Sequence, residues 1–363
     1  MRVGTMTFHT ALNFGAVLQT YALYKTIKDK GHDVKVIDYR APFNEKRFAP
    51  KPISYFFNIR TIYNILFRNG YEIYYKDGFQ NFLNQYLELT KPVYDKEGLT
   101  SLSSSFDIFI TGSDQVWNLA CTEGDEMFYL PFVEEQKKRN SYAASIGYSK
   151  LPISEVDRYR RLMMDFCNIS VREQSALDIV KNLTGKNVEL VLDPTFLLDK
   201  AQWEKIADYT QLPKDCRYLL LYVMAEDNVL IKEAQICAKK NNLKVVYITQ
   251  RFFKLGGALN LRNVTPEQWL GLFLKADIVV TNSFHGLVFS INFNRQFITR
   301  YIPRSITNSR IETILSLLNL HFRRIDSESY ENVGTMEYSV INKELQKLRN
   351  KSLNYLDKIL NND

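Results

Sequence analysis

A chain of 363 residues with 45% hydrophobic and 24% charged residues has the composition of an ordinary globular protein, and its length favours two domains over one. The net charge of +7 is spread along the chain, and no zinc-finger spacing or RNA-binding signature is present, so no nucleic-acid partner is expected. The four cysteines are far apart in sequence, which excludes a disulfide-stapled fold and a CxxC redox centre.

The sequence also indicates where the protein acts. Its first residues lack the basic-then-apolar pattern of a signal peptide, and no apolar run reaches the ~18 residues of a membrane span. We therefore expect reduced thiols and a cytoplasmic protein, with the inner face of a membrane as an alternative location. The positive charge suits a small anionic ligand or peripheral contact with an anionic membrane, although solubility alone would also explain it.

The beginning of the chain is typical of a βαβ unit, which opens a parallel sheet. A strand is predicted over residues 2–8, a helix over 16–30 and a second strand over 34–39. Asn13 is a helix-capping residue type, and Gly15 allows close approach of the backbone to a ligand or to a neighbouring element. The intervening loop lacks the G-x-G-x-x-G pattern of dinucleotide-binding domains, so no redox cofactor of that kind is expected.

Residues 41–105 form an irregular insertion that is rich in aromatic residues. Helices are predicted within it over 61–67 and 76–86. We expect this insertion to shape a pocket for an acceptor substrate.

A cluster of short polar side chains follows the strand predicted over 106–111. These side chains could hold hydroxyl groups, and they belong to Ser113, Asp114, Gln115 and Asn118. Trp117 lies beside them as a stacking face. The alternative is a capped helix start without a ligand. The next predicted strand, 140–146, ends at Gly147.

Arg172 follows a short strand at 169–171 and precedes a helix at 174–183. At the end of a strand, its guanidinium could form bidentate hydrogen bonds with a carboxylate or a phosphate. Pairing of Arg172 and Glu173 with other side chains is the alternative. A strand over 188–192 then ends at Asp193-Pro194, a natural domain boundary because the residue before a proline avoids the helical conformation.

A second α/β series follows this boundary. Its predicted elements are a helix at 201–209, a strand at 218–224, a helix at 229–241, a strand at 244–249, helices at 267–275 and 311–318 and a strand at 296–301. An amphipathic helix at 341–360 could pack across both domains. The fold class is therefore α/β, with two facing doubly wound Rossmann-like domains and a cleft between them. We place the acceptor side in 1–195, the donor side in 196–338 and the closing helix in 339–363.

The stretch at 276–292 organises this second series. It contains an apolar strand, the helix-cap types Asn282 and Ser283, and then His285 and Gly286 in the turn or first helical turn. Open α/β sheets bind their ligands at the carboxyl ends of their strands, and helix N-termini favour anions. A histidine at this place could exchange a proton as a ligand comes and goes; the alternative is a surface histidine with a capping role.

Seven motifs resemble those of the polysaccharide pyruvyl transferase family, and they occur in the family's order. They are NFGAVLQTYAL (13–23), TGSDQVWN (111–118), YAASIG (142–147), SVRE (170–173), VLDPTFLL (191–198), TNSFHG (281–286) and NSRIETIL (308–315). Each is weak alone, but together they span almost the whole chain.

This resemblance implies a fold like that of the GT-B glycosyltransferases. It implies transfer of the enolpyruvyl-derived group of phosphoenolpyruvate to hydroxyls of a sugar in a surface polysaccharide, such as a capsule or exopolysaccharide, or in its lipid-linked precursor. The product is a pyruvate ketal, and phosphate is released. Neither a metal nor a cofactor is expected, since phosphoenolpyruvate is the donor substrate.

The resemblance also assigns roles. The family's histidine matches His285, and its donor arginine in the V-R-E motif matches Arg172. Some members have R-L-H where this chain has Ser283-Phe284-His285, and we expect Arg310 to supply the missing charge, with Arg304 and Arg300 as alternatives. The full donor site is predicted as Arg172, Asn282, Ser283, Gly286 and Arg310. The acceptor site is predicted as Asn13, Gly15, Ser113, Asp114, Gln115 and Asn118.

Two other functions remain open from the sequence. One is a GT-B glycosyltransferase that uses a nucleotide sugar, for which the loop at Gly256 and Gly257 could hold a diphosphate. The other is a non-catalytic binding protein of an envelope-assembly complex.

Overall fold

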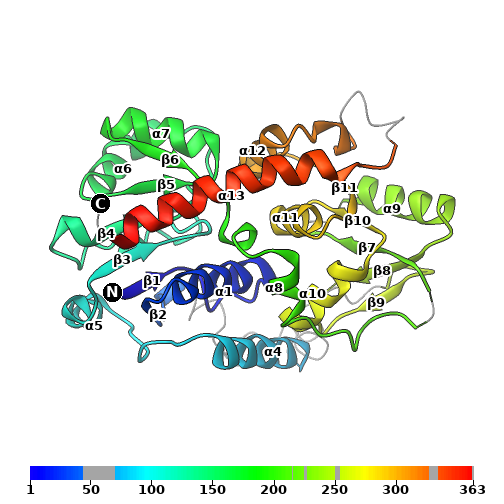
Figure 1. Ribbon diagram of the computed structural model, residues 1–363, viewed down its shortest axis with the longest axis horizontal. Coiled ribbons are helices and arrows are strands. Elements are labelled where there is room, and N and C mark those ends of the chain that lie inside the picture. The colour runs from blue at the N-terminus through cyan, green and yellow to red at the C-terminus, as the bar shows by residue number, and fades with distance from the viewer. Residues whose placement is uncertain (44–69, 215, 225–226, 250–253, 327–333, 362–363) are drawn as a thin grey trace, which may run out of the picture.

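The computed structural model describes residues 1–43, 70–214, 216–224, 227–249, 254–326 and 334–361. Two α/β domains lie side by side, and one long helix runs along both of them (Figure 1). The predicted helix at 61–67 lies outside the described residues.

The N-terminal domain is built on a parallel sheet. Its strands are ordered β2–β1–β3–β4. Their bounds are β1 (Arg2–Met6), β2 (Asp33–Val36), β3 (Ile108–Thr111) and β4 (Arg139–Ser141). A parallel pair of strands, β5 (Ile169–Val171) and β6 (Val188–Leu190), continues the sheet through single bridges from Asn140 to Asn168 and from Ala144 to Val171. The sheet therefore presents the carboxyl ends of all six strands along one edge.

Helices cover this sheet on both faces. They are α1 (Phe14–Asp29) on one face and α6 (Val156–Met163) and α7 (Gln174–Thr184) on the other. Helix α4 (Gly70–Tyr86) packs on α1, and the short α5 (Lys96–Ser101) precedes β3. Strand β3 is buried on both faces, so its apolar residues alternate between two cores: Ile108 and Ile110 join one, and Phe109 joins the other.

The C-terminal domain has a second parallel sheet with the order β11–β10–β7–β8–β9. Its strands are β7 (Tyr218–Tyr222), β8 (Lys244–Ile248), β9 (Leu259–Leu261), β10 (Ile278–Thr281) and β11 (Gln296–Thr299). Its helices are α8 (Lys200–Glu204), α9 (Asn228–Lys240), α10 (Pro266–Lys275), α11 (Phe284–Asn292) and α12 (Ser309–Leu317). Chain order reverses between β7 and β10, which is where ligands bind in sheets of this kind.

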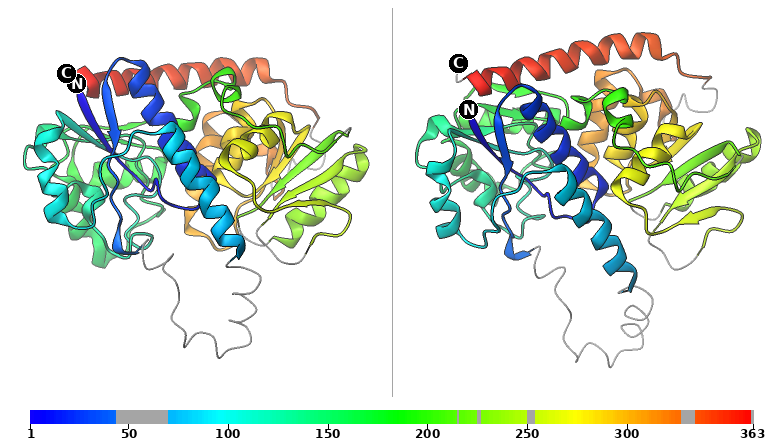
Figure 2. Two further views of the ribbon diagram at one scale, coloured as in Figure 1. Left: turned by 90° about the horizontal axis from the view of Figure 1, so that it is seen from below. Right: turned by 60° about the horizontal axis from the view of Figure 1, so that its bottom comes forward.

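Buried aromatic rings join the two domains into a common core. Phe14, at the start of α1, stacks on Trp269 of α10 with ring centroids 5.6 Å apart, and Tyr21 lies 5.6 Å from Trp203 of α8. Helix α13 (Tyr338–Asn361) begins beside the C-terminal domain and ends above the N-terminal one (Figure 2). Near its end the Tyr355 hydroxyl donates to the Ser141 carbonyl at 3.0 Å. The relative position of the domains is thus fixed by buried contacts.

The predicted fold class is confirmed, and most elements lie within a few residues of their predicted bounds. The helix predicted at 201–209 was too long: α8 ends at Glu204, and Asp208 instead donates its N–H to the Glu267 carbonyl. The prediction missed β9, a three-residue edge strand that is only half-buried and so lacks a clear pattern. Within the described residues, no helix is both long and apolar enough to cross a membrane.

Candidate functional site

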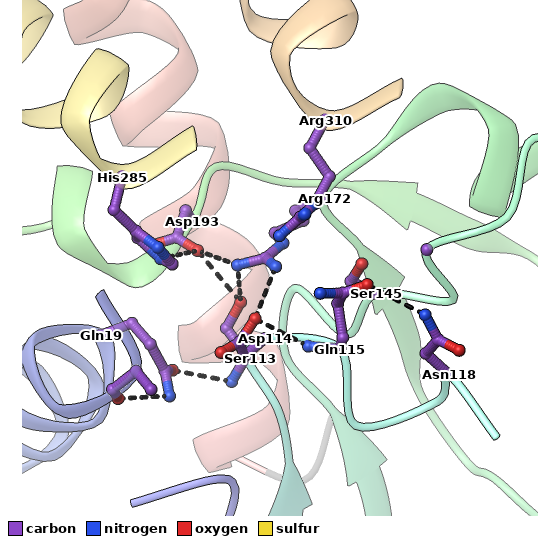
Figure 3. Close-up of polar contacts among 12 residues, drawn as sticks. Gln19, Ser113, Asp114, Gln115, Asn118, Ser145, Arg172, Asp193, His285 and Arg310 are labelled. Atoms are coloured by element: carbon purple, nitrogen blue, oxygen red, sulfur yellow. Dashed lines mark hydrogen bonds and ion pairs between the residues drawn. The ribbon is translucent and has the colours of Figure 1, made fainter. Parts of the chain in front are cut away.

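The predicted site residues come from strand ends in both domains. Asp114 follows β3 and Arg172 follows β5, whereas His285 lies in the first turn of α11, just after β10. The structure brings these three residues together with Asp193, in the segment that connects the domains (Figure 3). The site is therefore shared by both domains.

Arg172 is held between two carboxylates. Its side chain is only 1% exposed, and its two terminal nitrogens donate to Asp193 Oδ2 at 2.6 Å and to Asp114 Oδ1 at 2.9 Å. Burial alone would lower the pKa of Arg172, but these two carboxylates raise it above its ordinary value. Of the two possibilities that the sequence left open, the structure has the arginine paired with side chains.

Asp114 meets Arg172 from an unusual backbone conformation. Its φ is +72°, in the left-handed region that few non-glycine residues adopt, although aspartate tolerates it. Burial alone would raise the pKa of Asp114, but the positive charge of Arg172 holds it below its ordinary value. The loop after β3 thus delivers a carboxylate to the arginine.

Asp193 is the residue that sequence reasoning missed, because it was read only as a boundary. Its side chain is fully buried, and its Oδ2 accepts from Arg172 and from the Ser113 hydroxyl at 3.2 Å. Its Oδ1 accepts from the backbone N–H and the hydroxyl of Thr195. Burial alone would raise the pKa of Asp193, but neighbouring His285 and Arg172 hold it far below its ordinary value. The signal in the sequence was the acid of the VLDPTFLL motif, placed directly after a strand.

His285 faces this carboxylate. Its Nε2 lies 3.7 Å from Asp193 Oδ2, beyond hydrogen-bond length, and has no hydrogen-bond partner among the described residues. The Ser283 hydroxyl accepts from the Gly286 N–H at 3.2 Å and so caps the helix on which the ring stands. On its other side the ring rests on Gly15 of α1, where an added Cβ would overlap the imidazole. The ring is 9% exposed and lies between Gly15 of the N-terminal domain and the carboxylate of Asp193, so it is neither in bulk solvent nor surrounded by hydrocarbon alone.

Arg310 supplies a second positive charge. It lies in the first turn of α12 and points toward Arg172 (Figure 3). Its Nε donates to the Thr307 carbonyl at 3.3 Å, and no carboxylate partner for it is found among the described residues. Burial lowers the pKa of Arg310, and the like charge of Arg172 lowers it further. Of the three candidate arginines it is the one at the site: Arg300 donates to both oxygens of Asp227 at 2.8 Å, and Arg304 is exposed.

Glu173 organises the neighbouring loop. Its Oε1 accepts from the Ser145 hydroxyl and from the N–H groups of Ile146 and Gly147, at 2.8 to 3.2 Å. Its second oxygen lies 3.9 Å from Arg172 Nε without a hydrogen bond. The SVRE motif therefore supplies an arginine to the site and a carboxylate that shapes the YAASIG loop beside it.

The six residues predicted for the acceptor fall into separate groups. Asn13 caps α1 by accepting from the Ala16 N–H, and Gly15 lies against His285. Ser113 is buried, and its hydroxyl oxygen lies 2.7 Å from the Ala143 carbonyl, which shares the single hydroxyl proton with Asp193. Figure 3 shows Ser113 and Asp114 beside Arg172, with Gln115 and Asn118 farther along the same loop. Asn118 Nδ2 donates to Gln115 Oε1 at 2.9 Å.

Three other sequence expectations concern neighbouring residues. The expected stacking role of Trp117 is wrong, because its ring is fully buried and packs parallel to Tyr129 at 5.7 Å. Asn282 Oδ1 accepts from the Met224 N–H, and Gly286 packs against Thr281. Across the residues that the structure describes, no group of three or more histidine, cysteine or acidic residues could hold a metal.

A comparison with protein families now identifies the chain. The family described as polysaccharide pyruvyl transferase matches residues 13–301. The chain belongs to the polysaccharide pyruvyl transferase family. It is therefore a transferase whose acceptor is a sugar. The matched stretch includes Arg172, Asp193 and His285, whereas Arg310 lies beyond it. No curated protein sequence gives a significant match.

Solved structures with low sequence identity share the fold of this pyruvyl transferase family member. A Listeria monocytogenes protein described as a UDP-N-acetylglucosamine 2-epimerase is 10% identical with a TM-score of 0.52, covering 100% of this chain and 89% of that one. Staphylococcus aureus MnaA with UDP is 12% identical with a TM-score of 0.51, covering 100% and 97%. The Neisseria meningitidis UDP-GlcNAc 2-epimerase bound to UDP-GlcNAc is 9% identical with a TM-score of 0.50, covering 99% and 94%. This likeness identifies two Rossmann-like domains of GT-B type.

The buried charge of Asp193 gives a prediction about stability and pH. Asp193→Asn leaves part of Arg172 unpaired, so we expect a loss of about 3–5 kcal/mol of unfolding free energy at pH 7. The folded-state pKa of Asp193 lies below its unfolded value of about 3.9, so its contribution is present above that pH and is lost as the pH falls. Denaturant unfolding from pH 7 to pH 3 should therefore show the gap between wild type and variant narrowing below about pH 4. The exposed Asp157→Asn is the control, and a gap independent of pH would contradict the prediction.

The contact between Gly15 and His285 gives a second prediction. Gly15→Ala adds a methyl group where the imidazole lies, so the ring must move. The family resemblance assigns the catalytic role to this ring, and displacing a catalytic group by about 1 Å can cost ~100-fold in rate, so we expect a loss of transferase activity of that order. Gly256→Ala is the matched control, because a Cβ there meets open space. Equal activities of the two variants would show that the position of the ring is unimportant.

Proposed function

We propose that this transferase moves the enolpyruvyl-derived group of phosphoenolpyruvate to two hydroxyls of one sugar residue, forming a pyruvate ketal and releasing phosphate. The observation that supports it is a histidine whose buried Nε2 has no hydrogen-bond partner among the described residues, beside a carboxylate–arginine network. A second arginine approaches the same network and has no carboxylate partner among those residues (Figure 3). Such a site offers a proton donor beside positive charge, as a small anionic donor requires.

The reaction needs a proton at one carbon and an acceptor at the next. Protonation of C3 of phosphoenolpyruvate turns its methylene into a methyl group and leaves an oxocarbenium-like centre at C2. A sugar hydroxyl attacks C2 and loses its proton, and the bond between C2 and the phosphate oxygen then breaks. A second hydroxyl closes the ketal and loses its proton, so the two released protons balance the one added to C3 and the one gained by phosphate. We assign the protonation of C3 to His285. In the alternative, His285 contacts the bridging phosphate oxygen and another acid protonates C3.

The donor carries a phosphate and a carboxylate, and their charges need a cation that is not already neutralised. Asp114 and Asp193 balance Arg172, so its role is to shape the site and to keep His285 and Asp193 in place. Arg310 and the positive end of α11 are then the groups that attract the donor, with Asn282, Ser283 and Gly286 forming the turn beneath it. This shifts the main donor contact from Arg172 to Arg310.

The acceptor is proposed to lie on the N-terminal side, along the loop of Asp114, Gln115 and Asn118. The sugar belongs to a surface polysaccharide or to its lipid-linked precursor, and a lipid-linked acceptor would bring this positively charged protein to the inner face of the membrane. The neighbours of similar fold with UDP or UDP-GlcNAc bound are too distant in sequence to carry their ligands over to this chain.

Phosphate release tests this function. We expect phosphate from phosphoenolpyruvate only when a suitable free or lipid-linked saccharide is present, and calorimetry should detect binding of phosphoenolpyruvate in preference to UDP and GDP. His285→Ala should fold normally and lose more than ~100-fold in turnover, since a positioned acid contributes about 10²–10⁴-fold. His321→Ala, at an exposed histidine, should keep full activity. Tight binding of UDP without any phosphate release would favour the glycosyltransferase. The absence of both ligand binding and phosphate release would favour a non-catalytic protein.

Arg310→Ala tests the assignment of the donor. Hydrogen bonds to charged groups contribute about 1.5–3 kcal/mol, so the dissociation constant of phosphoenolpyruvate should rise by roughly 10- to 150-fold, with much less effect on acceptor binding. Arg304→Ala removes an exposed arginine of the preceding loop and should change neither constant. Arg172→Ala, by contrast, should lower stability as well, because it leaves the buried carboxylate of Asp193 and the partly buried one of Asp114 without their partner. An equal effect of Arg310→Ala on both substrates would refute the assignment.

A further inference from the structure

Phe284 contacts each of the positively charged or basic groups of the site. Its ring centroid lies 4.7 Å from Arg172 Cζ and 5.6 Å from Arg310 Cζ. It also meets the His285 ring edge to face, with centroids 5.1 Å apart. Phe284 is 8% exposed, so these contacts lie where little water can compete.

The two arginines have different needs for such a contact. Arg172 is held in place by two carboxylates, and its positive charge repels that of Arg310. Among the described residues, Arg310 has one hydrogen bond, to a backbone carbonyl, and it contacts the aromatic ring. An aromatic face attracts a guanidinium without cancelling its charge, and the attraction grows when water is excluded. The ring can therefore hold two like charges near one another and leave Arg310 available to an anion.

We propose that Phe284 is a positioning residue that holds Arg310 beside Arg172 on one aromatic ring and thereby sets the affinity of the site for its anionic donor. The identity of that donor as phosphoenolpyruvate rests on the proposed function. The inference also fits the departure of this chain from the R-L-H pattern: the start of α11 carries Ser283 and Phe284, and the guanidinium arrives from α12 instead. In this view the ring on one helix positions the charge of the other.

Substitutions of the ring test this role by calorimetry and steady-state kinetics with phosphoenolpyruvate. Cation–π contacts contribute about 0.5–2 kcal/mol, so Phe284→Leu should weaken phosphoenolpyruvate binding by ~2- to 30-fold and act on KM more than on kcat. Phe284→Tyr keeps the aromatic face and should restore most of the affinity. Phe289→Leu, on the same helix but facing Trp203 and Trp269, is the control for lost packing and should change the melting temperature without changing the affinity.

A double-mutant cycle separates this inference from the proposed function. In the Arg310→Ala background, Phe284→Leu should weaken phosphoenolpyruvate binding by a smaller factor than in wild type, because the contact is already absent. The same four proteins without ligand should show a combined fall in melting temperature that is smaller than the sum of the single falls. If the wild type neither binds phosphoenolpyruvate nor releases phosphate, the proposed function fails and the ligand-free cycle still decides the role of the ring. Additive effects in that cycle, or failure of Phe284→Tyr to restore affinity, would overturn the inference.

Discussion

The buried pair of Asp193 and Arg172 is the interaction on which the site depends. Removing two charges from water is costly, and only good geometry with further hydrogen bonds can offset that cost. Here Asp193 has bonds from Ser113 and Thr195 in addition to the arginine, and Asp114 accepts a second bond from Arg172. Because these groups come from β3, from β5 and from the segment between the domains, the pair fixes three parts of the chain relative to one another.

This pairing changes what each arginine can do. A guanidinium that already faces two carboxylates has little charge left for an anionic ligand, however suitable its position at a strand end. The second arginine, Arg310, lies close enough to Arg172 for the like charge to lower its pKa, and its guanidinium contacts the aromatic face of Phe284. The site therefore contains a neutralised network that sets its shape and a less neutralised cation beside Arg172, to which the proposed function gives the task of attracting the donor.

The sequence could predict the strands, helix caps and helices that depend on the local pattern of residues. An apolar run, a capping serine and helical spacing placed His285 at a strand end, and β10, Ser283 and α11 are where that pattern put them. What depends on distant partners was not visible. The sequence indicated that Gly15 allows close approach to a ligand or to a neighbouring element, but it could not identify the His285 ring, 270 residues away, as that neighbour. Trp117 was misread because a tryptophan beside polar residues has the same pattern whether its ring faces a sugar or Tyr129.

The same contacts between the domains hold both the common core and the geometry of the site. Phe14 stacks on Trp269 across the interface, and the next residue, Gly15, carries the His285 ring. The neighbour of that histidine, Phe284, in turn contacts Arg172 of the N-terminal domain. A rotation that opened the domains would separate the aromatic stack and the two ring contacts together, at the cost of exposing buried apolar surface. The arrangement of histidine, carboxylate and arginines is therefore held by hydrophobic burial, before any ligand binds.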